Sequence, residues 1–172
     1  MVAVAAVVAV LRRMPRAYVA LGANLGDPPA QIEQALVRMS QLPGTRLLAR
    51  SRLYRSAPLG PTGQADYCNA AAALHTALDP EALLDALQGI EAEAGRMRGE
   101  HWGARSLDLD LLMVDDCTSA TPRLTLPHPQ LANRRFVLQP LAEIAPDLEL
   151  PGHGPIARRL AALPPWEVQP WT

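Results

Sequence analysis

The sequence places the same kind of helix start twice, each time after an apolar run that is typical of a β-strand. Asp27-Pro28 and Asp79-Pro80 join a residue that caps a helix to one that fits its first turn. After each pair, apolar residues recur at helical spacing and form one face for burial. They are Ile32, Ala35, Leu36 and Met39 in the first helix, and Leu83, Leu84, Leu87 and Ile90 in the second. The chain must therefore pack two amphipathic helices against the strands that precede them.

Four segments are predicted to be strands: residues 18–21, 46–55, 67–76 and 107–114. Together with the two helices they follow the order strand, helix, strand, strand, helix, strand. This is the split βαβ pattern of ferredoxin-like α+β folds, in which the sheet is antiparallel. Further helices are predicted at 134–144 and 155–163. We therefore expect a ferredoxin-like split βαβ core whose antiparallel sheet is covered by helices on both faces.

The 172 residues contain no linker that would divide them, so residues 16–172 are predicted to form a single domain. Residues 1–15 are interpreted as an extension. Their apolar run is shorter than the roughly 20 residues that span a membrane. Its two arginines follow the run, whereas those of a signal peptide precede it. Three explanations stay open: a true start at Met14, which we favour, a disordered extension, or an additional edge strand.

The composition excludes several kinds of chemistry. All 16 basic residues are arginine, so neither a phosphate-binding loop with its lysine nor a Schiff base can form. A phosphate would be held by arginine, backbone amides and metal. The net charge of −1 indicates no nucleic-acid or membrane partner. Cys68 and Cys117 have no metal-binding spacing and are interpreted as reduced thiols in a cytoplasmic protein.

Two aspartates stand two residues apart in the last predicted strand. Because side chains alternate along a strand, Asp108 and Asp110 should share one face, while Leu107, Leu109 and Leu111 point into the core. Two adjacent carboxylates repel each other unless a cation lies between them. Mg²⁺ is commonly held by one or two carboxylates together with substrate phosphates. The alternative is that both aspartates are surface residues paired with nearby arginines.

A segment rich in cations lies directly before this strand. Within about ten residues of Asp108 it contains Arg96, Arg98, His101, Trp102 and Arg105, and all of these except Arg105 lie between Gly95 and Gly103. Cations beside paired carboxylates are typical of phosphoryl transfer. A two-metal nuclease would also use paired acids, but it would need a basic stripe for the nucleic acid, and the sequence has none.

The stretch HWGARSLDLDLL at 101–112 resembles the signature of the 6-hydroxymethyl-7,8-dihydropterin pyrophosphokinase family. Further similar stretches follow in the family's order between residues 17 and 163, among them ALGANLG at 20–26 and SAPLGP at 56–61. The resemblance implies an enzyme that transfers diphosphate from ATP to the hydroxymethyl group of the pterin and releases AMP, in folate biosynthesis. The alternative is a non-catalytic pterin- or nucleotide-binding module of the same fold. One departure from the family, a shortened loop around Gly99, puts loop closure and ATP affinity in question.

The resemblance also implies roles for individual residues. The catalytic residues would be Arg96, Arg105 and Asp110, and two Mg²⁺ ions would be held by Asp108 and Asp110. The pterin would be bound by Ser56, Leu59, Tyr67, Asn69, Trp102 and Phe136. ATP, the co-substrate, would be bound by Gln88, Glu91, Arg98, Leu111, Arg123, Thr125, His128 and Arg134. The expected partners are these two small molecules alone, and the protein is expected to be a monomer.

Overall fold

The computed structural model describes residues 14–95 and 106–172, which share one six-stranded antiparallel sheet. Its central strand β1 is flanked by β4 and β5, while β2 and β3 both pair with β4, and β10 pairs with the outer side of β3. The strands are β1 (Arg16–Ala23), β2 (Thr45–Arg50), β3 (Tyr54–Ser56), β4 (Tyr67–Thr76), β5 (Asp108–Val114) and β10 (Val168–Pro170). This arrangement confirms the predicted α+β class and its ferredoxin-like core.

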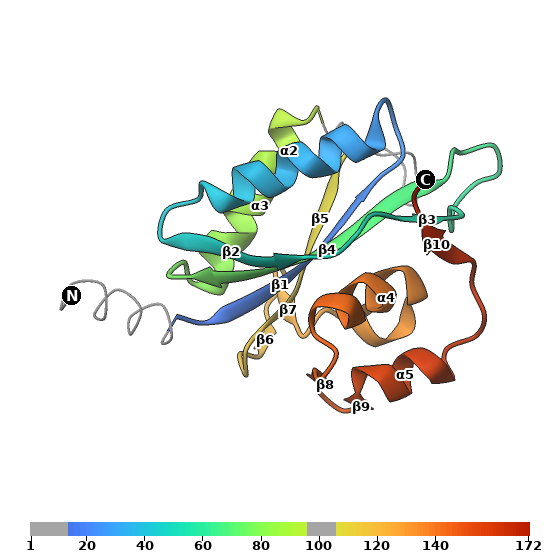
Figure 1. The fold of residues 1–172 in the computed structure, drawn as a ribbon. Helices are drawn as coiled ribbons and strands as arrows, with labels where there is room; N and C mark the ends of the chain where they lie inside the picture. The colour runs from blue at the N-terminus through green and yellow to red at the C-terminus, as the bar shows by residue number, and fades with distance from the viewer. Residues whose placement is uncertain (1–13, 96–105) are drawn as a thin grey trace, which may run out of the picture.

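Helices cover both faces of the sheet, as predicted (Figure 1). Helices α2 (Pro28–Ser40) and α3 (Pro80–Glu93) lie on one face, and α4 (Arg135–Ile144) on the other, with α5 (Ile156–Ala162) against it. The two predicted caps form. The Asp27 carboxylate accepts a hydrogen bond from the amide of Ala30 at 3.1 Å, and Asp79 accepts one from Ala82 at 2.9 Å. Each carboxylate thus satisfies an otherwise unpaired amide of the first turn.

Two apolar clusters, one on each face of the sheet, form the core. The alternation of β1 divides its side chains between them, because Val19 and Leu21 pack under α2 and α3 while Tyr18 and Ala20 face α4. Strand β4 crosses both clusters with four consecutive alanines at 70–73, and their small side chains allow close approach of the helices. The site described below opens on the α4 face.

The predicted strand 46–55 is wrong in one respect, because it is broken into β2 and β3. Ser51, which lies between them, is buried and bonds with its backbone amide to the carbonyl of Ala71 at 2.9 Å. Its hydroxyl accepts a hydrogen bond from the Ala71 amide at 2.9 Å. The Ser51 hydroxyl thus replaces the backbone carbonyl that would accept this hydrogen bond in a continuous strand. The pairing of β2 with β4 also shifts register between Leu47 and Ala49. The break turns β3 into a separate short strand.

Several short elements were not predicted from the sequence. They are the hairpin of β6 (Ser119–Ala120) and β7 (Thr125–Leu126), the hairpin of β8 (Glu149–Leu150) and β9 (Gly154–Pro155), the 3₁₀ turn η1 (Leu131–Asn133), and β10. Predictions on residues 1–13 and 96–105 fall outside the described part of the chain. Within the part that is described, the helices are all too short or too polar to cross a membrane.

Candidate active site

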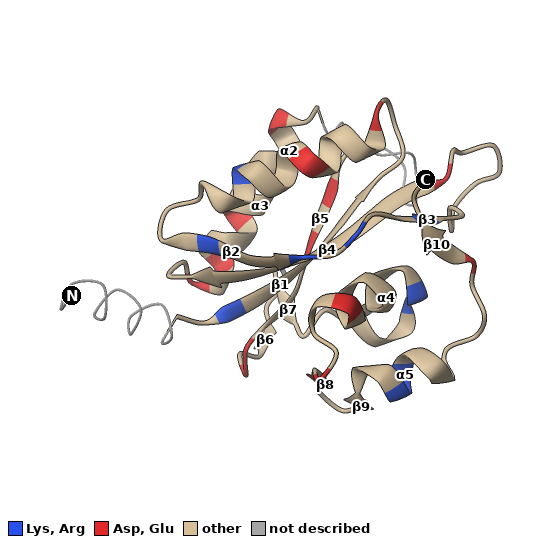
Figure 2. Ribbon diagram, in the orientation of Figure 1, with Lys and Arg blue, Asp and Glu red and all other residues tan. Residues whose placement is uncertain are grey.

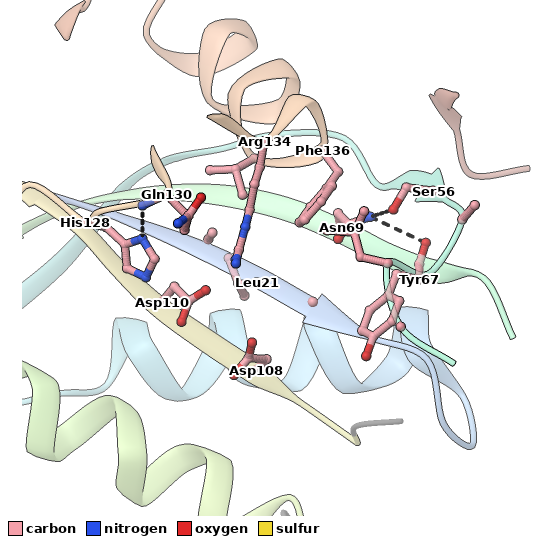
Figure 3. A pocket seen from close by; sticks show the side chains of 16 residues that line it. Leu21, Ser56, Tyr67, Asn69, Asp108, Asp110, His128, Gln130, Arg134 and Phe136 are labelled. Atoms are coloured by element: carbon pink, nitrogen blue, oxygen red, sulfur yellow. Dashed lines mark hydrogen bonds between the residues drawn. The ribbon is translucent and has the colours of Figure 1, made fainter. Parts of the chain in front are cut away.

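A cavity of about 380 Å³ opens between the α4 face of the sheet and the beginning of α4 (Figure 3). Its floor comes from the strands, one wall from the connection after β3, and the opposite wall from the segment that leads into α4. The lining residues are Ala20, Leu21, Gly22, Ser56, Ala57, Leu59, Gly60, Tyr67, Asn69, Asp108, Asp110, His128, Gln130, Arg134, Phe136 and Val137.

The floor is a row of residues in register across three strands. Gly22 of β1 is paired with Asn69 of β4 on one side and with Asp108 of β5 on the other. Ala20 stands opposite Asp110 in the same way. Because adjacent strands lie about 4.8 Å apart, roughly 10 Å separates Asn69 from Asp108, with almost no side chain between them. The two small residues of β1 therefore leave room for a flat ligand across the sheet.

The β4 end of the cavity is polar and buried. Asn69 and Ser56 are only 5% and 3% exposed, and the Asn69 amide donates a hydrogen bond to the Ser56 hydroxyl at 2.7 Å (Figure 3). The same amide nitrogen lies 3.5 Å from the carbonyl of Tyr67. The rings of Tyr67, from the beginning of β4, and Phe136, from the first turn of α4, also line this end (Figure 3). A buried amide beside aromatic rings is suited to a flat heteroaromatic ligand that needs both stacking and edge hydrogen bonds.

The β5 end carries two acidic residues of the sheet, both on its edge strand β5 (Figure 2). Asp108 and Asp110 both line the cavity, whereas Leu107, Leu109 and Leu111 lie in the cluster under α2 and α3. This confirms the alternation that the sequence predicted. Both aspartates are half-buried.

His128 and Arg134 close this end of the cavity above the two carboxylates (Figure 3). Burial lowers the pKa of His128, the positive charge of Arg134 lowers it further, and the charge of Asp108 acts in the opposite direction. The Nδ1 atom of His128 accepts a hydrogen bond from the amide of Gln130 at 3.1 Å. The imidazole is therefore neutral near pH 7 and carries its proton on Nε2, where it can donate a hydrogen bond.

The carboxylate pair fits magnesium. Nowhere in residues 14–95 and 106–172 do three or more His, Cys, Asp or Glu side chains gather into a metal-binding group. A cage of three or four such side chains, as zinc uses, is therefore missing from this part of the chain. Two oxygen donors on one face of a strand, open to a cavity, match an ion that takes its remaining ligands from phosphates and water.

Other residues predicted for the ATP site lie around β5 rather than in the cavity. Glu91 of α3 is 3% exposed and accepts a hydrogen bond from the amide of Leu109 at 2.7 Å. It therefore holds the outer edge of β5. Leu111 has its side chain in the core beneath α2 and α3, and Gln88 is exposed on α3.

Thr125 is the first residue of β7, Arg123 lies two residues before it, and both are exposed. Arg123 is ion-paired with two acids of α3: its guanidinium contacts Asp85 and lies 3.4 Å from the Glu81 carboxylate. Of the remaining predicted residues, Arg96, Arg98, Trp102 and Arg105 lie outside the described residues. The cavity itself brings together Ser56, Leu59, Tyr67, Asn69, Asp108, Asp110, His128, Arg134 and Phe136.

The sequence prediction missed the residues that shape the cavity without carrying obvious chemistry. Ala20 and Gly22 occupy alternate positions of β1, and this spacing was the signal for a floor made of small residues. Gln130 follows two residues after His128 and lines the same end. Asn24, only 3% exposed, donates a hydrogen bond to the carbonyl of Ala65 at 3.1 Å and so holds the connection between β3 and β4.

Solved structures share this fold. A Plasmodium falciparum HPPK-DHPS structure, described as wild type with pteroate, superimposes with a TM-score of 0.69 at 13% identity. It covers 87% of this chain, which spans only 42% of that one. Another, described as HPPK-DHPS in complex with substrates, has a TM-score of 0.67. The chain thus spans less than half the length of these solved proteins, and the likeness shows the fold alone.

Sequence comparisons find relatives of much higher identity. A protein of Pseudomonas aeruginosa named 2-amino-4-hydroxy-6-hydroxymethyldihydropteridine pyrophosphokinase is 52% identical over 149 residues, which are 87% of this chain and 92% of the relative. A relative of the same name from Haemophilus influenzae is 51% identical over 138 residues, 80% of this chain and 86% of its own. The profile of the family described as 7,8-dihydro-6-hydroxymethylpterin-pyrophosphokinase matches residues 18–146. The chain therefore belongs to the 7,8-dihydro-6-hydroxymethylpterin-pyrophosphokinase family.

Proposed function

We propose that this protein transfers diphosphate from ATP to the hydroxymethyl group of 6-hydroxymethyl-7,8-dihydropterin and releases AMP, in folate biosynthesis. Family membership supports the reaction. The observation that carries the assignment of the site is the arrangement of one cavity. It has a buried amide and hydroxyl at its β4 end and paired carboxylates at its β5 end, roughly 10 Å apart across a floor of small residues. A flat ring and a polyphosphate could therefore meet in the middle.

The pterin is assigned to the β4 end. Its polar edge would hydrogen-bond with Asn69, which Ser56 holds in place, while Tyr67, Phe136 and Leu59 surround the ring. The guanidinium of Arg134 lies 5.9 Å from the centre of the Phe136 ring, so this aromatic side chain is fixed from the β5 side. Trp102 is proposed to complete the aromatic surroundings.

The phosphates of ATP are assigned to the β5 end, where Asp108 and Asp110 would hold two Mg²⁺ ions. Bound magnesium would neutralise charge on the phosphates of ATP. Arg134 and the Nε2 proton of His128 would bind phosphate oxygens, with Arg96, Arg98 and Arg105 closing over them. Gln88, Arg123 and Thr125 would line the remainder of the nucleotide site, beyond the edge of β5. Glu91 and Leu111, whose side chains are buried, would support this site from within the fold.

The reaction needs no protein nucleophile. The hydroxymethyl oxygen of the pterin attacks the β-phosphorus of ATP, and the bond from that phosphorus to the bridging oxygen of the α-phosphate breaks, so AMP leaves with that oxygen. The hydroxymethyl proton is lost in the same step, and the Asp110 carboxylate is the proposed acceptor. The protein's main contribution is to hold the two substrates in line and to exclude water.

The test is release of AMP from ATP with magnesium and 6-hydroxymethyl-7,8-dihydropterin. The wild type should form AMP only when the pterin is present, and Asp110→Ala should reduce the rate by a factor of about 1000 or more. Asp116→Ala is the matched control, because Asp116 is an exposed aspartate just beyond the other end of β5. If the wild type binds pterin but forms no AMP, the protein is a binding module. Equal losses in both variants would contradict the role of Asp110.

We further infer a single domain over residues 16–172, a monomer and a cytoplasmic location. The shared sheet with a core on each face supports the first inference. Sedimentation equilibrium would test the second, and a mass of two chains would contradict it. Titration with Mn²⁺ in the presence of a non-hydrolysable ATP analogue would count the metal ions, for which we expect two per chain.

A further inference from the structure

Strand β10 lies at the edge of the sheet, next to β3 (Figure 1). It pairs with β3 so that Val168 is opposite Ser56 and Pro170 is opposite Tyr54. Strand β3 has only three residues, and its other neighbour is β4. Ser56 is its last residue, and the cavity-lining residues Ala57, Leu59 and Gly60 follow at once. The outer backbone groups of this short strand are therefore covered by β10.

The segment is held from the α2 face by an aromatic side chain. Trp171 donates its backbone amide to the carbonyl of Leu53 at 2.9 Å, and its ring packs against the cluster under α2 and α3. The guanidinium carbon of Arg55 lies 4.6 Å from the centre of that ring. This distance is within the range of a cation–π contact, and Arg55 is the residue directly before Ser56.

The segment is also held from the α4 face. The side-chain amide of Gln139 donates to the carbonyl of Val168 at 3.4 Å. Gln139 lies in α4 one turn after Phe136, which lines the cavity. Residues Val168–Trp171, which we name the β10 strap, thus join the wall formed by β3 to the wall formed by α4.

We propose that the β10 strap is a positioning element for the pterin site, acting through Ser56 and Phe136 without contact with substrate. The proposal rests on the assignment of the pterin to the β4 end. A three-residue strand with an open outer edge frays readily. The pterin would then have to order β3 on binding. Its apparent affinity would fall in proportion to the fraction of protein molecules in which β3 is already ordered. The ATP end should respond much less than the pterin end, because β4 and β1 lie between β3 and β5 and the guanidinium of Arg134 is 5.9 Å from the centre of the Phe136 ring.

The first experiment is Trp171→Ala, with the dissociation constant of the pterin measured by fluorescence titration and the KM of ATP measured by AMP release. We expect the dissociation constant to rise about tenfold, as for the loss of one good contact, and the KM of ATP to stay within about twofold. Trp171→Phe keeps an aromatic ring over Arg55 and should restore most of the affinity. Trp166→Ala is the matched control, since Trp166 is 40% exposed and precedes the strap.

The alternative is that Trp171 contributes only to general stability. In that case the pterin constant and the KM of ATP would change together, and the proposal would be overturned. It would also be overturned if neither constant changed. If Trp171→Ala does not fold, Arg55→Met removes only the guanidinium, and an unchanged pterin constant in that variant would refute the proposal.

Failure of the proposed function can be recognised separately. A wild type that releases no AMP contradicts the reaction, whereas the ratio of pterin constants still tests the strap. Hydrogen exchange adds a readout without substrate: Trp171→Ala should speed exchange of the Ser56 amide but leave that of the Leu109 amide unchanged. The proposal would be overturned if the wild type bound no pterin. It would also be overturned if Trp171→Ala changed the exchange rates of the Ser56 and Leu109 amides by the same factor.

Discussion

Replacing Gly22 by alanine should stabilise the fold and impair the site at the same time. A Cβ added to Gly22 would lie 3.6 Å from the Oδ1 atom of Asn69 and 3.8 Å from the Cδ1 atom of Tyr67, which are ordinary contact distances. The protein should therefore accept the methyl group without strain. Alanine in a strand is favoured over glycine by about 0.5–1 kcal/mol. For a chain of this size we expect the melting temperature to rise by about 2 °C.

The same methyl group stands on the floor of the cavity, midway between Asn69 and Asp108. A ligand that rested on the backbone of Gly22 would be lifted by about 1.5 Å, the length of one carbon–carbon bond, since its atoms keep about 3.5–4 Å from the methyl carbon. Hydrogen bonds to Asn69 would then be stretched beyond about 3.5 Å. We expect the pterin to bind at least about tenfold more weakly and turnover to fall about a hundredfold, because displacements near 1 Å have that effect.

Calorimetry, pterin titration and AMP release would measure these effects. Gly89→Ala is the control, because a Cβ at Gly89 in α3 meets no atom within 4 Å and the residue lies outside the cavity. It should raise the melting temperature by a similar amount, with unchanged pterin affinity. If Gly22→Ala binds pterin and turns over within about twofold of the wild type, the ligand does not rest on Gly22 at the floor of the cavity. A melting temperature lowered by several degrees would refute the packing argument.

Three further predictions follow from buried or paired polar groups. Asn69→Ala should weaken pterin binding about tenfold or more and leave the KM of ATP unchanged; parallel changes in both constants would contradict the assignment. Glu91→Ala should cost about 1–3 kcal/mol in the free energy of unfolding, because it leaves the Leu109 amide without its acceptor; urea titration would measure this, and a change below about 0.5 kcal/mol would contradict it. Burial acts to raise the pKa of Glu143, but hydrogen bonds from the Tyr54 hydroxyl and the Arg52 amide, with the charge of Arg52, lower it below the ordinary glutamate value. A lowered pKa stabilises the fold above the pKa of the unfolded chain, and this stability is lost as pH falls through the folded pKa. Glu143→Gln should therefore reduce the free energy of unfolding at pH 7 by about 1 kcal/mol. The difference from the wild type should shrink as pH falls through the lowered pKa of Glu143, and a difference independent of pH would contradict the linkage.

Local periodicity explains why much of the fold was predicted correctly. Asp27 and Asp79 cap their helices through contacts with residues three positions later, so neighbouring sequence determines them. Asp108 and Asp110 share a face because a strand has a period of two, whatever its partners are. The cap and the two-residue period do not depend on how the helix or strand packs in the fold. The period is sufficient to identify Asp108 and Asp110 as a pair on one face.

Pairing between distant segments could not be derived in this way. Residues 46–55 look continuous, and only the bond between Ser51 and Ala71 shows where the strand breaks. The position of Arg123 against the acids of α3 likewise depends on how β7 packs, which no local pattern encodes.

The sequence by itself determined the two capped helices, the order of the strands and the alternation that brings Asp108 and Asp110 together. These depend on spacings of two to four residues, and such spacings are fixed by backbone geometry. The tertiary structure alone decided that Gly22 lies between Asn69 and Asp108 and that Val168 covers Ser56. The register between strands distant in sequence depends on the burial of both sheet faces at once, because a slip by one residue would exchange the core face and the cavity face.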